Sequence, residues 1–196
     1  MRNFFARYGY SSVKMFVNQF AVSLFGMVLA LAASGEKNRV LLILASALSV
    51  LLYLFLIYMM TWEVGAKDKI SIDYGKIKRR PYLGFLMALI ANIPNFIIAI
   101  IYTVICVFTQ YDASIVRRIA FFFVGMYQGF LRGIEIGGAP MYEFWWSYFV
   151  IIIPSLITAG VAYWLGIKNI HFTKLMEAEY PESDREPKKK WFGKDK

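Results

Sequence analysis

The stretch YLGFLMALIANIPNFIIAIIYTVICVF, residues 82–108, decides the fold class. It holds no charged residue and no histidine, and it is longer than the roughly 20 helical residues that cross the apolar core of a bilayer. We therefore predict a transmembrane helix here, tilted or projecting beyond the lipid. Asn92, Pro94 and Asn95 interrupt the apolar run near its middle, where polar residues are costly and often functional.

Pro94 and the two asparagines beside it predict a polar site at mid-depth. Proline has no N–H to donate, and its ring collides with the carbonyl four residues back, here that of Ile90. The freed carbonyl then lacks a hydrogen-bond donor, and lipid cannot supply one. Asn92 and Asn95 are three residues apart and share one face of a helix. Their amides could bond the loosened backbone, bond a neighbouring helix or line a pocket.

A second stretch, IPSLITA at residues 153–159, resembles IPNFIIA at residues 93–99. Four of the seven positions are identical, and Ser155 stands where the first stretch has Asn95. Paired helices broken near the bilayer centre form the binding sites of inverted-repeat transporters. We therefore expect Pro154, Ser155 and Thr158 to join the predicted polar site. The alternative is two unrelated helix bends.

Further apolar runs lie on both sides of this segment. Residues 15–33, 40–61 and 145–165 are each long enough to span a bilayer core. The run 119–131 covers only about 20 Å against a core of about 30 Å, and arginines bound it. We interpret it as a re-entrant or interfacial helix, and a short fifth span is the alternative.

These runs predict an all-α fold, a multi-pass integral membrane bundle with four transmembrane helices and one re-entrant or interfacial helix. Residues 1–166 would form the transmembrane domain, and residues 167–196 a charged cytoplasmic tail. The first run ends in ALAAS, residues 30–34, which is similar to a signal-peptide cleavage site. We expect an uncleaved signal anchor, and cleavage would leave three spans in the same orientation.

Charge predicts the orientation. The net charge is +9, and the lysines and arginines gather before the first span, in residues 62–81 and in the tail. The positive-inside rule then places both termini in the cytoplasm of a plasma-membrane protein. Residues just before the third span are expected to contact anionic lipid headgroups of the inner leaflet: Lys76, Lys78, Arg79 and Arg80. Lys67 and Asp68 are expected to form a solvated pair, and no nucleic acid is expected as a partner.

Composition supports a membrane protein and offers little chemistry. The 196 residues are 59% hydrophobic, with a mean hydropathy of +0.51, which is more apolar surface than a soluble domain of this size hides. The chain has one cysteine, Cys106, and one histidine, His171, and no charged residue in the four spans. Few sets of nucleophile, acid and base can be built from these. We expect no catalytic residue, no metal, no cofactor and no enzyme activity.

Gly125, Gly129 and Gly133 form a double G-x-x-x-G ridge in the short apolar run. Glycine at every fourth position lets another helix approach closely. We expect close packing within one chain, and contact within a homo-oligomer is the alternative.

The leading functional hypothesis is a small transport-related protein: a permease, a channel-like oligomer or the membrane subunit of a transporter. Neutral hydrogen-bonding groups near mid-depth would hold its substrate. The alternative is a non-catalytic accessory or regulatory protein that assembles with another membrane complex of the cell envelope.

Overall fold

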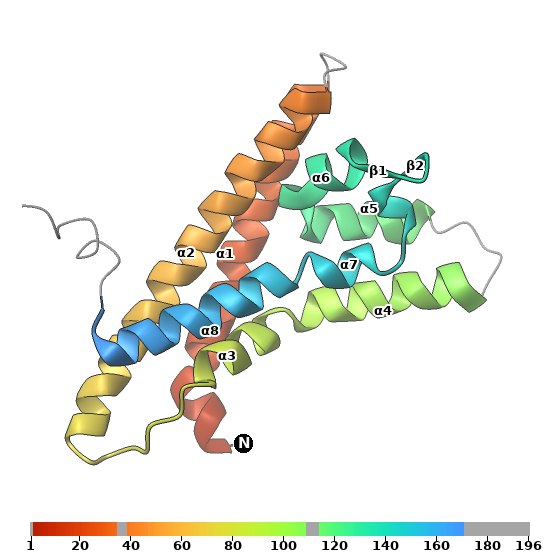
Figure 1. The fold of residues 1–196 in the computed structure, drawn as a ribbon. Coiled ribbons are helices and arrows are strands. Elements are labelled where there is room, and N and C mark those ends of the chain that lie inside the picture. Colours follow the sequence, from red (N-terminus) through yellow and green to blue (C-terminus); the bar gives the residue numbers. More distant parts are fainter. Residues whose placement is uncertain (1, 35–38, 109–113, 171–196) are drawn as a thin grey trace, which may run out of the picture.

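Two long helices form the frame of the molecule. The computed structural model describes residues 2–34, 39–108 and 114–170. Helices α1 (Arg2–Ser34) and α2 (Arg39–Asp73) run side by side in opposite directions (Figure 1). At 1.5 Å per residue each is about 50 Å long, which exceeds the thickness of a bilayer core. The predicted spans 15–33 and 40–61 lie inside them, and both helices continue well past the apolar residues.

The third predicted span is broken. Helix α3 (Leu83–Ala91) and helix α4 (Ile93–Phe108) meet at Asn92 with a bend of 56°. Pro94 is the second residue of α4, a position where a missing N–H leaves no helical bond unmade. The last predicted span has a two-residue turn at residues 151–152, between α7 (Ser147–Val150) and α8 (Ile153–Lys168), but it still forms one span from Ser147 to Lys168. Pro154 is the second residue of α8. Both prolines therefore begin helices.

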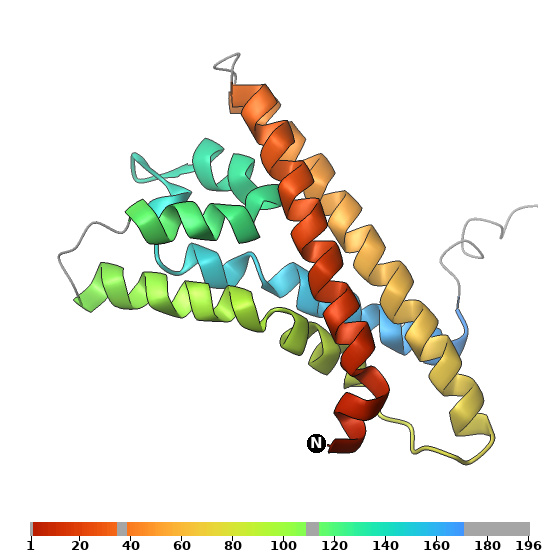
Figure 2. The same cartoon turned by 180° about the vertical axis from the view of Figure 1, so that it is seen from behind.

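Residues 119–131 do not form one short helix. They belong to α5 (Ser114–Phe123), the 3-10 turn η1 (Gly125–Tyr127) and α6 (Gln128–Gly133). Figure 2 shows α5 running toward the α1–α2 pair and α6 turning back from it.

The fold is predominantly helical, as predicted, and a small β hairpin that the sequence did not predict is added to it. Strand β1 (Glu135–Ile136) pairs antiparallel with β2 (Ala139–Pro140). The turn between them has positive φ at Gly137 and Gly138, which favours glycine. The 3-10 helix η2 (Met141–Glu143) then leads toward α7.

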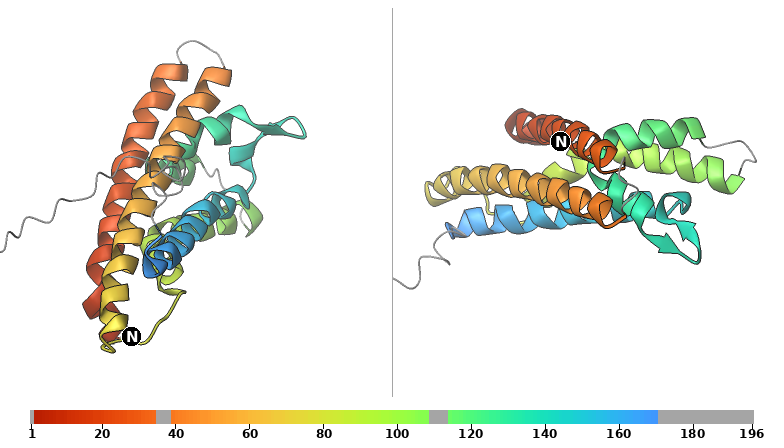
Figure 3. Two further views of the ribbon diagram at one scale, coloured as in Figure 1. Left: turned by 60° about the vertical axis from the view of Figure 1, so that its left-hand side comes forward. Right: turned by 90° about the horizontal axis from the view of Figure 1, so that it is seen from above.

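The remaining helices cross the long pair and extend beyond it. Helices α8 and α3 lie against the pair, whereas α4 and α7 lead away on one side, with α5 nearby (Figures 1 and 3). The start of α1, the end of α2, the start of α3 and the end of α8 share one end of the molecule. The start of α2 and the β hairpin lie near the opposite end, where Arg39 Nη2 is 2.7 Å from Glu135 Oε1.

Polarity along α2 is reversed relative to a soluble helix. Its buried face carries small or polar residues at helical spacing, including Ser46, Ser49, Thr61 and Gly65. Large apolar residues on the same helix are exposed: Leu44, Leu48, Leu51, Phe55 and Met59. Small and polar residues between helices, with apolar residues outside, are typical of membrane bundles. Among the described residues, three segments are long and apolar enough to cross a membrane: α1, α2, and α7 and α8 taken together. The bent α3–α4 pair could supply a fourth crossing.

Candidate functional site

Asn92 occupies the break between α3 and α4 and joins it to α8. Its side-chain Nδ2 donates to the Ala88 carbonyl at 2.9 Å and to Ser155 Oγ at 3.1 Å. Asn95 Nδ2 donates to Asn92 Oδ1 at 2.9 Å, and Ser155 Oγ donates to the Ile152 carbonyl at 2.8 Å. The three side chains thus satisfy backbone carbonyls at two helix breaks and bond to one another.

The structure brings together only part of the predicted site. Asn92, Asn95 and Ser155 are buried and in contact, as just described. Pro94 and Pro154 stand beside them as the second residues of their helices. Thr158 is half-buried one turn further along α8 and does not line the same void.

Other helices add polar groups that the sequence did not single out. Gln19 of α1, Tyr53 of α2 and Tyr127 of η1 line the same void as Asn92, Asn95 and Ser155. We call these six residues the Asn92 cluster. Gln19 Oε1, Asn95 Oδ1 and the Tyr127 hydroxyl are buried and have no hydrogen-bond partner within residues 2–34, 39–108 and 114–170. No part of the void is wide enough for a water molecule.

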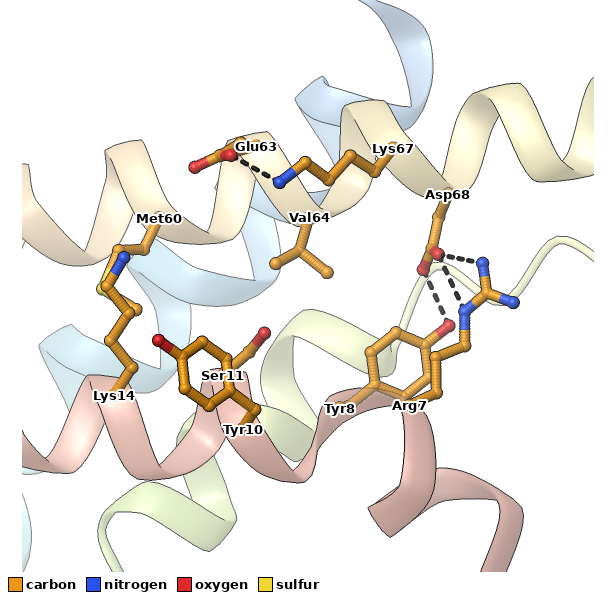
Figure 4. A pocket seen from close by; sticks show the side chains of 10 residues that line it. All are labelled: Arg7, Tyr8, Tyr10, Ser11, Lys14, Met60, Glu63, Val64, Lys67 and Asp68. Atoms are coloured by element: carbon orange, nitrogen blue, oxygen red, sulfur yellow. Dashed lines mark hydrogen bonds and ion pairs between the residues drawn. The ribbon is translucent and has the colours of Figure 1, made fainter.

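Asp68 forms a second buried polar cluster, near the end of α2 (Figure 4). The side chain of Asp68 is only 4% exposed. Its Oδ1 accepts hydrogen bonds from Arg7 Nη2 at 2.7 Å and Arg7 Nε at 3.2 Å. Its Oδ2 accepts from the hydroxyls of Tyr8 and Tyr163, each at 2.7 Å. We call these four residues the Asp68 cluster, and they tie together α1, α2 and α8.

The predicted Lys67–Asp68 pair is wrong. Residues 62–73 continue α2, so adjacent side chains point in different directions, and Asp68 turns inward. Lys67 Nζ instead bonds Glu63 Oε1 at 2.6 Å, one turn away on the exposed face (Figure 4). A buried carboxylate is stable only when paired and hydrogen-bonded, and four donor bonds meet that need for Asp68.

Two glycines position α8 against Asp68. A Cβ on Gly65 would overlap the carbonyl oxygen of Tyr163, and a Cβ on Gly166 would overlap that of Trp62. Helices α2 and α8 therefore touch backbone to backbone at this crossing. The close approach brings the Tyr163 hydroxyl onto the Asp68 carboxylate.

A cavity of about 310 Å³ lies between α1 and α2 beside this cluster. Figure 4 shows Lys14, Met60 and Glu63 at one side of it and Asp68 at the other. Its charges are largely paired within the protein: Arg7 bonds Asp68, and Lys67 bonds Glu63. A ligand that binds Arg7 or Lys67 would therefore have to displace existing ion pairs here.

The glycine ridge lies against the long helices of the same chain. Gly125 N–H donates to Ser23 Oγ of α1, and Gly129 N–H donates to Ser46 Oγ of α2, each at 2.6 Å. A Cβ on Gly129 would overlap the Leu42 carbonyl oxygen. Gly133 faces the side chain of Ile43. These contacts anchor the turn between α5 and α6.

The predicted headgroup residues lie on the connection between α2 and α3. All four are exposed: Lys76, Lys78, Arg79 and Arg80. Their contact with lipid stays a prediction. The predicted tail was residues 167–196, but α8 continues to Lys168. The part of the tail from residue 171 onward, with His171, lies outside the described residues.

No family model, curated protein or solved structure matches this chain. Among residues 2–34, 39–108 and 114–170, no three His, Cys, Asp or Glu side chains gather as a metal site would require.

Proposed function

We propose that the chain is an integral plasma-membrane protein that moves a small neutral polar solute past the Asn92 cluster. The observation that carries this proposal is that three residues lining one buried void each hold a polar atom with no hydrogen-bond partner among the described residues: Gln19 Oε1, Asn95 Oδ1 and the Tyr127 hydroxyl.

Unpaired polar atoms are costly inside a protein, at about 1–3 kcal/mol each. Scattered unpaired atoms would be defects, but three of them on one void are better explained by a ligand that pairs them. Two of the three are amide oxygens, which only accept hydrogen bonds. No charged side chain of the described part of the chain lines the void. The solute best suited to it is therefore neutral and carries hydroxyl or amide N–H donors.

The cluster is closed in this structure, so transport requires movement. Both sides of the void have a helix break, at Asn92 and at residues 151–152. Breaks of this kind let short helices rotate while long helices stay fixed. In this proposal α3–α4 and α7 open around the solute, while α1, α2 and α8 stay tied through the Asp68 cluster.

The orientation proposed from charge is compatible with the fold. The start of α1, the end of α2, the start of α3 and the end of α8 share one end, and Lys76, Lys78, Arg79 and Arg80 lie there. We place that end in the cytoplasm, with both termini on that side and α5–α6 as a re-entrant element from the other side. The basic residues would then meet the anionic inner leaflet.

A second candidate is the accessory role, in which the chain assembles with another membrane complex. The narrowness of the void favours it, because a dry cluster can also hold helices together without binding anything. In the accessory role, the Asn92 cluster would only satisfy the backbone groups left free at two helix breaks.

Solute flux separates the two candidates. The purified chain is reconstituted in liposomes, and glycerol and urea entry is followed by light scattering. We expect flux above that of protein-free liposomes, and we expect Asn95→Leu to abolish it by removing an amide from the void. Thr103→Val is the matched control, because its hydroxyl bonds the Ala99 carbonyl on the same helix and does not line the void. Flux that is equal in wild type and Asn95→Leu contradicts the site. A wild-type chain that passes neither probe and copurifies with a stoichiometric partner supports the accessory role.

A further inference from the structure

A cavity of about 440 Å³ lies where α5, α6, the β hairpin and η2 meet. It is lined by Arg117, Phe121, Arg132, Glu135, Pro140 and Tyr142. It shares no residue with the Asn92 cluster and lies near the opposite end of α2 from Asp68, since Glu135 bonds Arg39 at the start of that helix.

Aromatic rings hold both arginines in place. The Arg117 guanidinium carbon is 5.0 Å from the centre of the Tyr142 ring, and that of Arg132 is 4.8 Å from the centre of the Phe121 ring. The two rings meet edge to face at 5.9 Å. Guanidinium groups that contact rings in this way keep their N–H donors free for a second partner.

The charges of this cavity are not balanced within the described residues. Arg117 and Arg132 form no ion pair there, and Arg117 Nε is buried without an acceptor. The carboxylate of Glu135 is already paired with Arg39 at 2.7 Å. In the cavity beside Asp68, by contrast, two of the basic residues form ion pairs with acidic residues that line that same cavity.

We propose that the Arg117–Arg132 cavity binds a phosphate group, either of a phospholipid headgroup or of a free phosphate. Two guanidinium groups facing one cavity suit an oxyanion, since each can donate two parallel N–H bonds to it. Exposed Trp145 follows the cavity in the chain, and Trp residues gather at the lipid interface, where headgroups lie. This proposal does not depend on solute transport.

The binding test uses the purified full chain and substitutions at two adjacent arginines, Arg117 and Arg118. Inorganic phosphate is titrated by calorimetry in neutral detergent, and lipid retention is measured by native mass spectrometry after extraction from phosphatidylglycerol or phosphatidylcholine nanodiscs. We expect Arg117→Gln to weaken binding about tenfold or more, which is the loss of a hydrogen bond to a charged group. Arg118→Gln is the matched control, because Arg118 is exposed on the same helix and does not line the cavity.

The two probes separate the two sources of phosphate. If inorganic phosphate binds and Arg117→Gln weakens that binding, the ligand is a free phosphate. If only phosphatidylglycerol is retained, and Arg117→Gln loses it, the ligand is a lipid headgroup. Arg132→Gln repeats the test at an exposed side chain, whose replacement disturbs the fold less. If the Arg117→Gln chain misfolds, the Arg132→Gln chain still tests the proposal. Absence of binding to both probes overturns the proposal, as does an equal loss in Arg118→Gln. Solute flux plays no part in this readout, so either proposal can fail alone.

Discussion

Replacement of Tyr163 by phenylalanine tests whether a buried carboxylate ties α1, α2 and α8 together. The Tyr163 ring is fully buried, and its hydroxyl donates to Asp68 Oδ2 at 2.7 Å. Tyr163→Phe keeps the ring and removes only that donor, so no large cavity forms. Hydrogen bonds to charged groups contribute about 1.5–3 kcal/mol. We therefore expect the free energy of unfolding to fall by about that amount.

Tyr102→Phe is the matched control. The Tyr102 ring is equally buried, but its hydroxyl donates to the neutral carbonyl of Tyr142 at 2.9 Å. A neutral hydrogen bond contributes about 0.5–1.5 kcal/mol, so this change should cost less. Both variants are unfolded by SDS titration in mixed micelles and followed by circular dichroism.

A double variant isolates the charge. In an Asp68→Asn background the acceptor is neutral, so Tyr163→Phe should then cost no more than Tyr102→Phe does in the wild type. The reasoning is refuted if Tyr163→Phe and Tyr102→Phe cost the same in the wild type. It is also refuted if the cost of Tyr163→Phe is unchanged by Asp68→Asn.

Two further predictions concern close helix packing and share one control. Gly166→Ala should destabilise the chain by about 1–3 kcal/mol, because the new Cβ overlaps the Trp62 carbonyl and forces α8 off α2. Gly129→Ala should destabilise the chain by a similar amount, because the new Cβ would meet the Leu42 carbonyl and force α6 off α2. Gly160→Ala should be neutral or stabilising, because its nearest neighbour, Phe85 Cβ, lies at an ordinary 3.7 Å. SDS titration measures all three, and equal stability of Gly166→Ala and Gly160→Ala would contradict the packing.

The sequence located the apolar segments well but not the ends of the helices. Runs 15–33 and 40–61 mark where α1 and α2 are apolar, yet both helices extend past charged residues such as Lys14 and Lys67. Hydropathy shows which residues are stable in lipid. A helix requires only that its backbone hydrogen bonds are made, so it can continue through charged residues that are exposed.

The Asn92 and Asp68 clusters differ in how far sequence could predict them. Asn92, Asn95 and Ser155 stood out because each is a polar residue beside a proline in the middle of an apolar run. Asp68 was misjudged because its partners Arg7 and Tyr163 are far away in the chain, so only folding reveals them. One signal was available: the stripe Ser46, Ser49, Tyr53, Ile57, Thr61 and Gly65 continues with helical spacing to Asp68. That stripe predicts an inward-facing carboxylate.

The most direct test of the central claim is whether the Asn92 cluster opens to water. A Ser155→Cys variant in a Cys106→Ser background carries one thiol in the cluster, and Tyr74→Cys in the same background carries one at an exposed site. Both are reconstituted in liposomes and treated with a small water-soluble methanethiosulfonate. We predict that the Ser155→Cys thiol is modified more slowly than the Tyr74→Cys thiol but to completion, and that glycerol or urea slows it further. A Ser155→Cys thiol that stays unmodified while the Tyr74→Cys thiol reacts fully would contradict a transport site at this cluster.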